Sequence, residues 1–197
     1  MNENHFPSSA EVEQELQRQK YKSRYKRTLR STLFALITAA AAAILVATLW
    51  LPVLQIFGTS MTPTLQEGQI VASIKVNQPE QGDILAFYYG NKVLVKRYIA
   101  GPGDWVDIQE DGTVLVNSTP LEEPYLQEKA FGICDLELPY QVPDGCYFVM
   151  GDHRETSVDS RHSSVGCVSG EDIIGKIIFR VWPLEAFGPI VSKEAKE

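Results

Sequence analysis

The 197-residue chain has little cysteine, no excess of glycine or proline, and no excess of positive charge. Its three cysteines allow at most one internal disulfide. Fourteen Gly and eleven Pro are too few for a low-complexity or collagen-like chain. A formal net charge of −7 argues against a nucleic-acid-binding protein of the basic-patch kind. A mean hydropathy of −0.11 excludes a protein with many membrane spans, although it leaves room for one.

One long segment has no charge at all. Residues 32–57 contain no Asp, Glu, Lys or Arg, and about 20 consecutive apolar residues are enough for a helix to cross a bilayer. Trp50 fits the aromatic belt near the far end of such a span, and Pro52 fits the end of its helix. We therefore predict a transmembrane helix over residues 32–57.

The charges on the two sides of this segment differ in sign. Residues 1–31 carry seven basic and four acidic residues, and the basic cluster Lys20–Arg30 lies next to the apolar segment, whereas residues 58–197 are acidic overall. The positive-inside rule then predicts a cytoplasmic leader over residues 1–31 and an extracytoplasmic domain over residues 58–197. That domain is long enough to bury a core of its own.

Two other interpretations of the apolar segment stay open. A cleavable signal peptide has a short basic region and an apolar core of about 7–15 residues. Both parts are longer here, although the run Ala39–Ala43 offers small residues. A buried core helix is the second alternative, and such a helix is rarely uncharged on every face.

The residues after the segment indicate mostly β structure. Short runs rich in Val, Ile, Tyr and Phe alternate with turn signals such as Gly90-Asn91 and Asp111-Gly112. No long helical periodicity appears there. We predict strands at Gln69–Lys75, Asp83–Tyr89, Lys92–Ile99, Trp105–Ile108, Thr113–Val116, Cys146–Met150 and Ile173–Val181.

All three cysteines, Cys134, Cys146 and Cys167, follow the predicted span. The compartment expected for them is one in which disulfides can form. One disulfide among them and three ordinary small apolar residues are both open interpretations. None lies in a C-x-x-C pattern, which argues against a redox or catalytic cysteine.

Three polar clusters carry the candidate chemistry. The first is Gly58–Leu65, directly after the span, with Ser60 near its centre. The second contains Lys96 within an apolar strand, where burial would lower the pKa of the amine and make it a competent base. The third is the polar segment Gly151–Arg161. Each cluster also has a purely structural interpretation. Ser60 can be an ordinary turn residue, Lys96 can be an edge residue with its amine in water, and Gly151–Arg161 can be a loop held by ion pairs.

Together the three clusters resemble the bacterial type I signal peptidases in their compact, single-anchor form. The resemblance covers roughly residues 30–185 and rests on the order of the motifs behind an N-terminal anchor. It implies a mostly β fold, a coiled antiparallel β-sheet peptidase domain like that of the SOS repressors, preceded by one N-terminal transmembrane helix. The motifs are Gly58-x-Ser60-Met61-x-Pro63-Thr64-Leu65, Lys96-Arg97-x-Ile99 with Gly103-Asp104, and Gly151-Asp152 with Ser157-x-Asp159-Ser160-Arg161.

The resemblance implies a serine–lysine dyad. Ser60 is then the nucleophile, and its backbone N–H helps to hold the oxyanion. Lys96 is the general base, and Ser157 orients it. A lysine can act as a base only when its amine is neutral, so we expect Lys96 to be buried with a lowered pKa. The implied supporting residues are Gly151 and two ion pairs, Arg97 with Asp152 and Asp159 with Arg161.

This chain departs from the family pattern at two positions. Some relatives have a serine where Gly58 stands, and its hydroxyl is a second oxyanion donor. Gly58 has no side chain, so a second donor here has to come from backbone or water. The residue after Gly151-Asp152 is usually Asn in the family, and His153 adds a titrating group there.

Two other chemical interpretations of the clusters stay open. A triad of Ser60 with His153 or His162 would need a third partner that the sequence does not specify. A metal site of mixed oxygen and nitrogen ligands would use Asp152, His153, Asp159 and His162. Their spacing matches no metal-binding motif.

The resemblance implies a membrane-bound endopeptidase that removes signal peptides from exported preproteins after small-x-small sites, through an acyl-enzyme and without a metal or cofactor. The expected partners are preprotein signal peptides and membrane lipid, with no nucleic acid, and the chain is expected to be a monomer. Its expected place is the bacterial cytoplasmic membrane, as a single-pass protein with a cytoplasmic N-terminus. Met61 and its neighbours are expected to touch lipid. Two alternatives share the fold: a non-catalytic membrane-anchored assembly factor, and the self-cleaving domains of SOS repressors, whose DNA-binding domain takes the place of the span.

Overall fold

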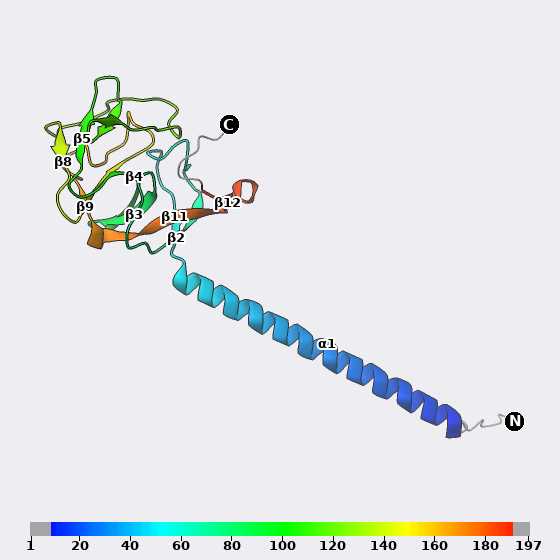
Figure 1. Ribbon diagram of the computed structural model, residues 1–197. Helices are drawn as coiled ribbons and strands as arrows, with labels where there is room; N and C mark the ends of the chain where they lie inside the picture. The colour runs from blue at the N-terminus through cyan, green and yellow to red at the C-terminus, as the bar shows by residue number, and fades with distance from the viewer. Residues whose placement is uncertain (1–8, 191–197) are drawn as a thin grey trace. The chain divides into compact units, whose positions relative to one another are not determined.

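A computed structural model describes residues 9–190 of the protein, which separate into a helical unit up to Leu49 and a β unit from Trp50. Helix α1 (Ser9–Trp50) has 42 residues (Figure 1). Within α1, the segment Leu16–Leu45 is long and apolar enough to cross a membrane. Its length and composition agree with a single N-terminal span.

The bounds of the helix differ from the predicted 32–57 at both ends. Helix α1 begins at Ser9 because the polar leader is rich in Glu, Gln, Lys and Arg, which are strong helix formers. It ends at Trp50, two residues before Pro52, because the residue before a proline disfavours helical geometry. The last apolar residues of the predicted helix belong to the β unit instead. Residues 1–8 of the predicted leader lie outside the described residues.

Two antiparallel sheets form the β unit (Figure 1). The larger sheet has the strand order β1-β2-β11-β3-β4-β9-β10, with β12 paired to β11, and the smaller has the order β7-β6-β5-β8. The strands of the larger sheet are β1 (Val53–Gln55), β2 (Ile70–Ile74), β3 (Ile84–Tyr89), β4 (Lys92–Ala100), β9 (Cys146–Met150), β10 (Val168–Ser169), β11 (Ile173–Trp182) and β12 (Gly188–Pro189). Those of the smaller are β5 (Trp105–Ile108), β6 (Val114–Val116), β7 (Thr119–Pro120) and β8 (Tyr140–Gln141). Two 3₁₀ turns, η1 (Gly170–Asp172) and η2 (Leu184–Ala186), flank β11.

The prediction of a mostly β, antiparallel unit behind one apolar helix is confirmed. Each of the seven predicted runs coincides with a strand to within one residue at either end. The strands that the sequence did not predict have two or three residues, which is too short for an alternating pattern to be recognised. Strand β1 lies in the segment that we assigned to the membrane, since apolarity alone does not distinguish a lipid-facing residue from a strand residue.

Strand β4 carries the predicted lysine through the middle of the larger sheet. It pairs with β3 so that Lys96 lies opposite Leu85, and it pairs with β9 from Arg97 onward. Fully buried Ile84, Leu85 and Phe87 of β3 pack beside it. Burying each such side chain contributes about 1.5–3 kcal/mol, so β4 has a rigid support.

Met61 does not form the lipid-facing surface that we expected. Its side chain is 2% exposed and packs in a core cluster with Leu65, Val71 and Ile84. Met61, which directly follows Ser60, thus packs the turn against the sheet.

The cysteines are free, and each is partly buried. Cys146 and Cys167 pack against the apolar cluster around Val106 and Phe148. Burial raises the pKa of the Cys167 thiol to about 11, which keeps it protonated and unreactive at neutral pH. In this structure Cys146 and Cys167 therefore act as small apolar residues.

Candidate active site

Ser60 lies in a tight turn between β1 and β2. The backbone N–H of Thr62 donates to the Thr59 carbonyl at 3.0 Å, and that of Leu65 donates to the Met61 carbonyl at 2.8 Å. Met61 and Leu65 anchor the turn in the core, while the side chain of Ser60 stays half-buried. The sequence thus buries two apolar residues of the turn, Met61 and Leu65, and leaves the Ser60 hydroxyl at the surface of the core.

Lys96 meets Ser60 across 36 residues of sequence. Its Nζ donates to Ser60 Oγ at 2.6 Å and to Ser157 Oγ at 3.1 Å. The lysine is 4% exposed. Burial lowers the pKa of this amine to about 8, because water no longer stabilises its charge, and the nearby Asp159 carboxylate offsets only part of the effect. A substantial fraction of the amine is therefore neutral at mildly alkaline pH.

A cleft opens at Ser60 and Lys96. Its walls come from β1 and the turn after it, and from the first half of β4. Most of the residues that line the cleft are apolar. The complete lining consists of Leu54, Gln55, Ile56, Phe57, Gly58, Ser60, Met61, Val93, Leu94, Val95 and Lys96.

The loop after β9 closes one side of the site, and Gly151 lies at its start. The N–H of Gly151 donates to Asp159 Oδ2 at 2.8 Å. A Cβ at this position would overlap both Ser157 Oγ and the Ser60 carbonyl oxygen. The same carbonyl accepts from the N–H of His153 at 3.0 Å. Glycine is thus required for the close approach of the loop to the nucleophile turn.

Arg97 and Asp152 form a fully buried, two-point ion pair. Arg97 Nε and Nη2 donate to the two oxygens of Asp152 at 2.8 and 2.6 Å. Thr64, from the turn that carries Ser60, donates its hydroxyl to Asp152 Oδ2 at 2.5 Å. This pair therefore joins β4, the loop after β9 and the Ser60 turn, as bidentate arginine–carboxylate geometry allows.

Asp159 and Arg161 form a second buried pair. Arg161 Nε and Nη2 each donate to Asp159 at 2.9 Å. Burial by itself raises the pKa of Asp159, but the hydrogen bonds and charge of Arg161 outweigh it, and the pKa is below its usual value. Asp159 is consequently ionised and holds Gly151, while Ser157 stands between this pair and Lys96.

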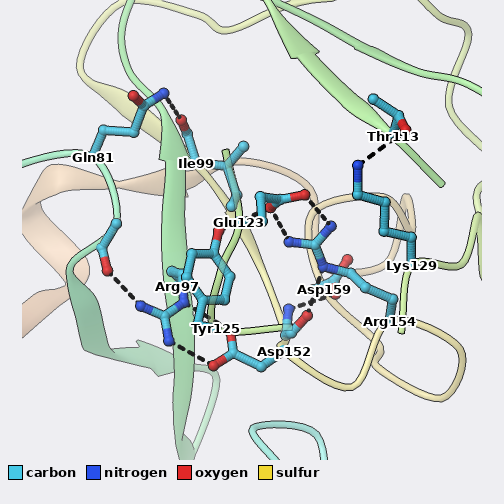
Figure 2. A network of polar contacts seen from close by, with 12 residues as sticks. Gln81, Arg97, Ile99, Thr113, Glu123, Tyr125, Lys129, Asp152, Arg154 and Asp159 are labelled. Carbon is cyan, nitrogen blue, oxygen red and sulfur yellow. Dashed lines mark hydrogen bonds and ion pairs between the residues drawn. The ribbon is translucent and has the colours of Figure 1, made fainter. Parts of the chain in front are cut away.

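A third buried ion pair, between Arg154 and Glu123, has no counterpart in the sequence analysis. Figure 2 shows the Glu123 carboxylate facing Arg154 on one side and the hydroxyl of Tyr125 on the other. The ring of Tyr125 lies 3.7 Å from the guanidinium of Arg97. Arg154 is in a cluster that the sequence singled out, but nothing in the spacing relates it to Glu123. A buried polar residue in an otherwise irregular segment gives no periodic signal.

The structure gives the two histidine interpretations no support. The ring of His153 contacts the Thr156 hydroxyl at 3.0 Å, and His162 lies 3.7 Å from Asp135. In residues 9–190, no group of three or more His, Cys, Asp or Glu side chains is placed to hold a metal ion. Asp152 and Asp159, which a metal would need, are each bound by an arginine.

All the site residues predicted from the sequence come together in the β unit. The chain combines an apolar N-terminal helix, an antiparallel β fold and a serine hydroxyl in contact with a buried lysine. The chain belongs to the signal peptidase, peptidase S26 family, whose sequence pattern matches residues 29–182.

Several relatives are similar over most of the chain. Thylakoidal processing peptidase 1 of Arabidopsis thaliana chloroplasts is 36% identical over an alignment of 166 residues that covers 76% of this chain and 47% of that protein. Signal peptidase IB of Staphylococcus aureus is 36% identical over an alignment of 150 residues that covers 66% of this chain and 77% of that protein. The chain thus spans about half the length of the chloroplast relative. A crystal structure of a signal peptidase I from Enterococcus faecalis is 30% identical, covers 50% of this chain and 96% of its own, and has a TM-score of 0.41.

Proposed function

We propose that this protein is a membrane-anchored serine endopeptidase that cleaves signal peptides from exported preproteins after small-x-small sites. The observation that carries the proposal is the 2.6 Å contact between Lys96 Nζ and Ser60 Oγ, made by an amine that is almost completely buried. A serine hydroxyl becomes nucleophilic when a positioned base takes its proton, and a neutral lysine is such a base.

The reaction is an acyl transfer in two steps. Neutral Lys96 accepts the proton of the Ser60 hydroxyl while Oγ bonds to the scissile carbonyl carbon. The backbone N–H of Ser60 stabilises the oxyanion, and the proton passes from Lys96 to the leaving amine as the C–N bond breaks. Lys96, neutral again, then deprotonates a water that attacks the acyl carbon, and it passes this proton to Ser60 Oγ as the ester bond breaks. Ser157 holds the amine in place from its other side.

Two strand edges at the cleft are suited to an extended peptide. Within the described chain, β1 pairs only with β2, and the part of β4 before Arg97 pairs only with β3. In the β3–β4 register, with the two-residue turn Gly90-Asn91, the backbone groups of Val93 and Val95 point away from β3. A substrate strand can pair there and present alternate side chains to the cleft wall. Where apolar residues line that wall closely, we expect small side chains of the substrate to fit best.

The anchor places the substrate and the nucleophile in one thin layer. Ser60 follows the end of α1 by ten residues, and a preprotein is tethered by its own apolar segment. Such confinement raises the effective concentration of the scissile bond. Phe57, which is 77% exposed between α1 and Ser60, is the side chain that we expect to contact lipid. The N-in orientation and the monomeric state are part of this proposal.

Cleavage of a preprotein with an Ala-x-Ala site tests the substrate class. The full chain in detergent is expected to cut after the second Ala. Replacing that Ala of the substrate by Phe should lower kcat/KM by about 100-fold or more, because a closed pocket cannot accept the larger side chain. Replacing the middle residue by Phe is the matched control and should have little effect. A folded protein that cuts none of several preproteins would instead favour the non-catalytic assembly factor.

The rate of cleavage is expected to rise with pH through a midpoint near 8. Burial lowers the pKa of Lys96 to about 8, so the neutral amine is scarce at pH 6 and predominant at pH 10. The profile of kcat/KM against pH between 6 and 10 measures this. A rate that does not change over this interval would contradict a titrating lysine base.

A further inference from the structure

The segment between β7 and β8 crosses the loop that carries Ser157. We call residues 121–135 the strap. Its Phe131 carbonyl accepts from Arg161 Nη1 at 2.8 Å, and the N–H of Asp135 donates to the Arg161 carbonyl at 3.1 Å. The Asp135 carboxylate also accepts from the N–H and hydroxyl of Ser163. One end of the loop is thus tied to the strap by backbone and side-chain hydrogen bonds.

The other end of the loop is tied to the strap by Glu123. Its carboxylate, which has no exposed surface, accepts from Arg154 Nη1 at 3.1 Å and also from Nη2. Burial opposes the charge of Arg154, but the hydrogen bonds and charge of Glu123 outweigh it and raise the pKa of the guanidinium. Arg154 then donates Nε to the carbonyl of Gly151 at 3.0 Å. The polar chain therefore runs from the strap to the carbonyl of Gly151. Figure 2 shows the part of it between Glu123 and Arg154.

Tyr125 gives the strap a second contact with the site. Its hydroxyl donates to Glu123 Oε1 at 2.8 Å, and its ring covers the Arg97 guanidinium at 3.7 Å. Arg97 in turn holds Asp152, the residue after Gly151. Both peptide groups of Gly151 are thus held, its carbonyl by Arg154 and its N–H by Asp159.

A displacement of Gly151 has to move Ser157. The position of the missing Cβ of Gly151 is already occupied by the Ser157 side chain, so the two residues are in close contact. Ser157 Oγ is one of the two oxygens that bind Lys96 Nζ. A small rotation of the Gly151 peptide would therefore change the angle at which the amine faces Ser60.

We propose that Glu123 is a positioning residue for the Ser60–Lys96 dyad: through Arg154 it fixes the Gly151 peptide and, with it, the Ser157 hydroxyl against the lysine. This inference rests on the proposed function of the dyad. A buried ion pair that only filled the interior would affect stability, whereas a positioning pair affects the chemical step separately.

The first test compares Glu123→Gln with Glu122→Gln in the full chain. Glu122 is the adjacent residue, and it is exposed. We expect Glu123→Gln to lower kcat by about 10- to 100-fold with little change in KM, because misplacement of a catalytic group acts on the chemical step. Its pH profile should shift to lower pH, since Ser157 no longer favours the charged amine. Glu122→Gln should behave as the wild type.

The second test separates an effect of Glu123 on the position of the dyad from an effect on the stability of the fold. It can be read even if Glu123→Gln folds poorly, because it uses a double variant. In Glu123→Gln/Arg154→Met no buried charge is left without its partner, so the melting temperature should recover towards the wild-type value. The kcat should stay low, because the Gly151 carbonyl has lost the Arg154 donor. Recovery of kcat together with the melting temperature, or a wild-type kcat in folded Glu123→Gln, would overturn the role of Glu123. Cleavage that persists in Ser60→Ala would overturn the dyad itself.

Discussion

Ser60→Ala and Lys96→Met are each expected to reduce the cleavage of a preprotein by at least about 10⁴-fold. Without the Ser60 hydroxyl no acyl-enzyme forms. Without the Lys96 amine, which lies 2.6 Å from that hydroxyl, no group in the described chain contacts Ser60 Oγ to take its proton. Single-turnover assays with the full chain in detergent measure both rates.

Folding should survive both substitutions. Lys96→Met replaces a buried, partly charged amine with an apolar side chain of similar length, so we expect a melting temperature equal to or above that of the wild type. Lys92→Met is the matched control, because Lys92 lies on the same strand and is exposed. It should cleave like the wild type. Turnover that is retained in Ser60→Ala or Lys96→Met would contradict the dyad.

Asp159→Asn is expected to cost both stability and rate. The substitution leaves Arg161, which is fully buried, without its two-point partner, and it weakens the acceptor of the Gly151 N–H. Breaking a buried pair in this way typically costs about 3–5 kcal/mol. For a unit of this size the melting temperature should fall by roughly 10 °C. Thermal unfolding followed by circular dichroism measures the fall.

The control for this substitution is Asp144→Asn, at an exposed turn. It should change the melting temperature by no more than about 1–2 °C. Because Asp159 has a lowered pKa in the folded protein, its contribution is present above pH 4 or so and is lost as the pH falls further. The difference between wild type and Asp159→Asn should therefore shrink in acid. An equal melting temperature at neutral pH would show that the pair does not stabilise the fold.

The fold class was largely predictable from local patterns. Alternating Val, Ile, Tyr and Phe predicted the long strands, because a half-buried strand needs one apolar face. The apolar segment was recognised for the same reason, but its end was placed too late. Leu54 and Ile56 are apolar because they pack in the β core, and hydropathy does not distinguish that environment from lipid.

The members of the site were predictable as a set, since each predicted residue is part of a short motif. The Arg97–Asp152 and Asp159–Arg161 pairs came from the resemblance rather than from spacing. Glu123 and Tyr125 were missed, because a buried ion pair between residues 31 apart depends on which loops meet in space. No local rule connects those loops.

The sequence by itself therefore determined the apolar helix, the antiparallel β unit and the members of the candidate site, because each of these is encoded by neighbouring residues. Only the tertiary structure decided that Lys96 is buried against Ser60 and that Glu123 reaches Gly151 through Arg154. Those contacts arise when β4, the Ser60 turn, the loop after β9 and the strap pack together and remove water from charges that would otherwise be solvated. That desolvation is what lowers the pKa of Lys96, and it is a property of the packed protein rather than of any short segment.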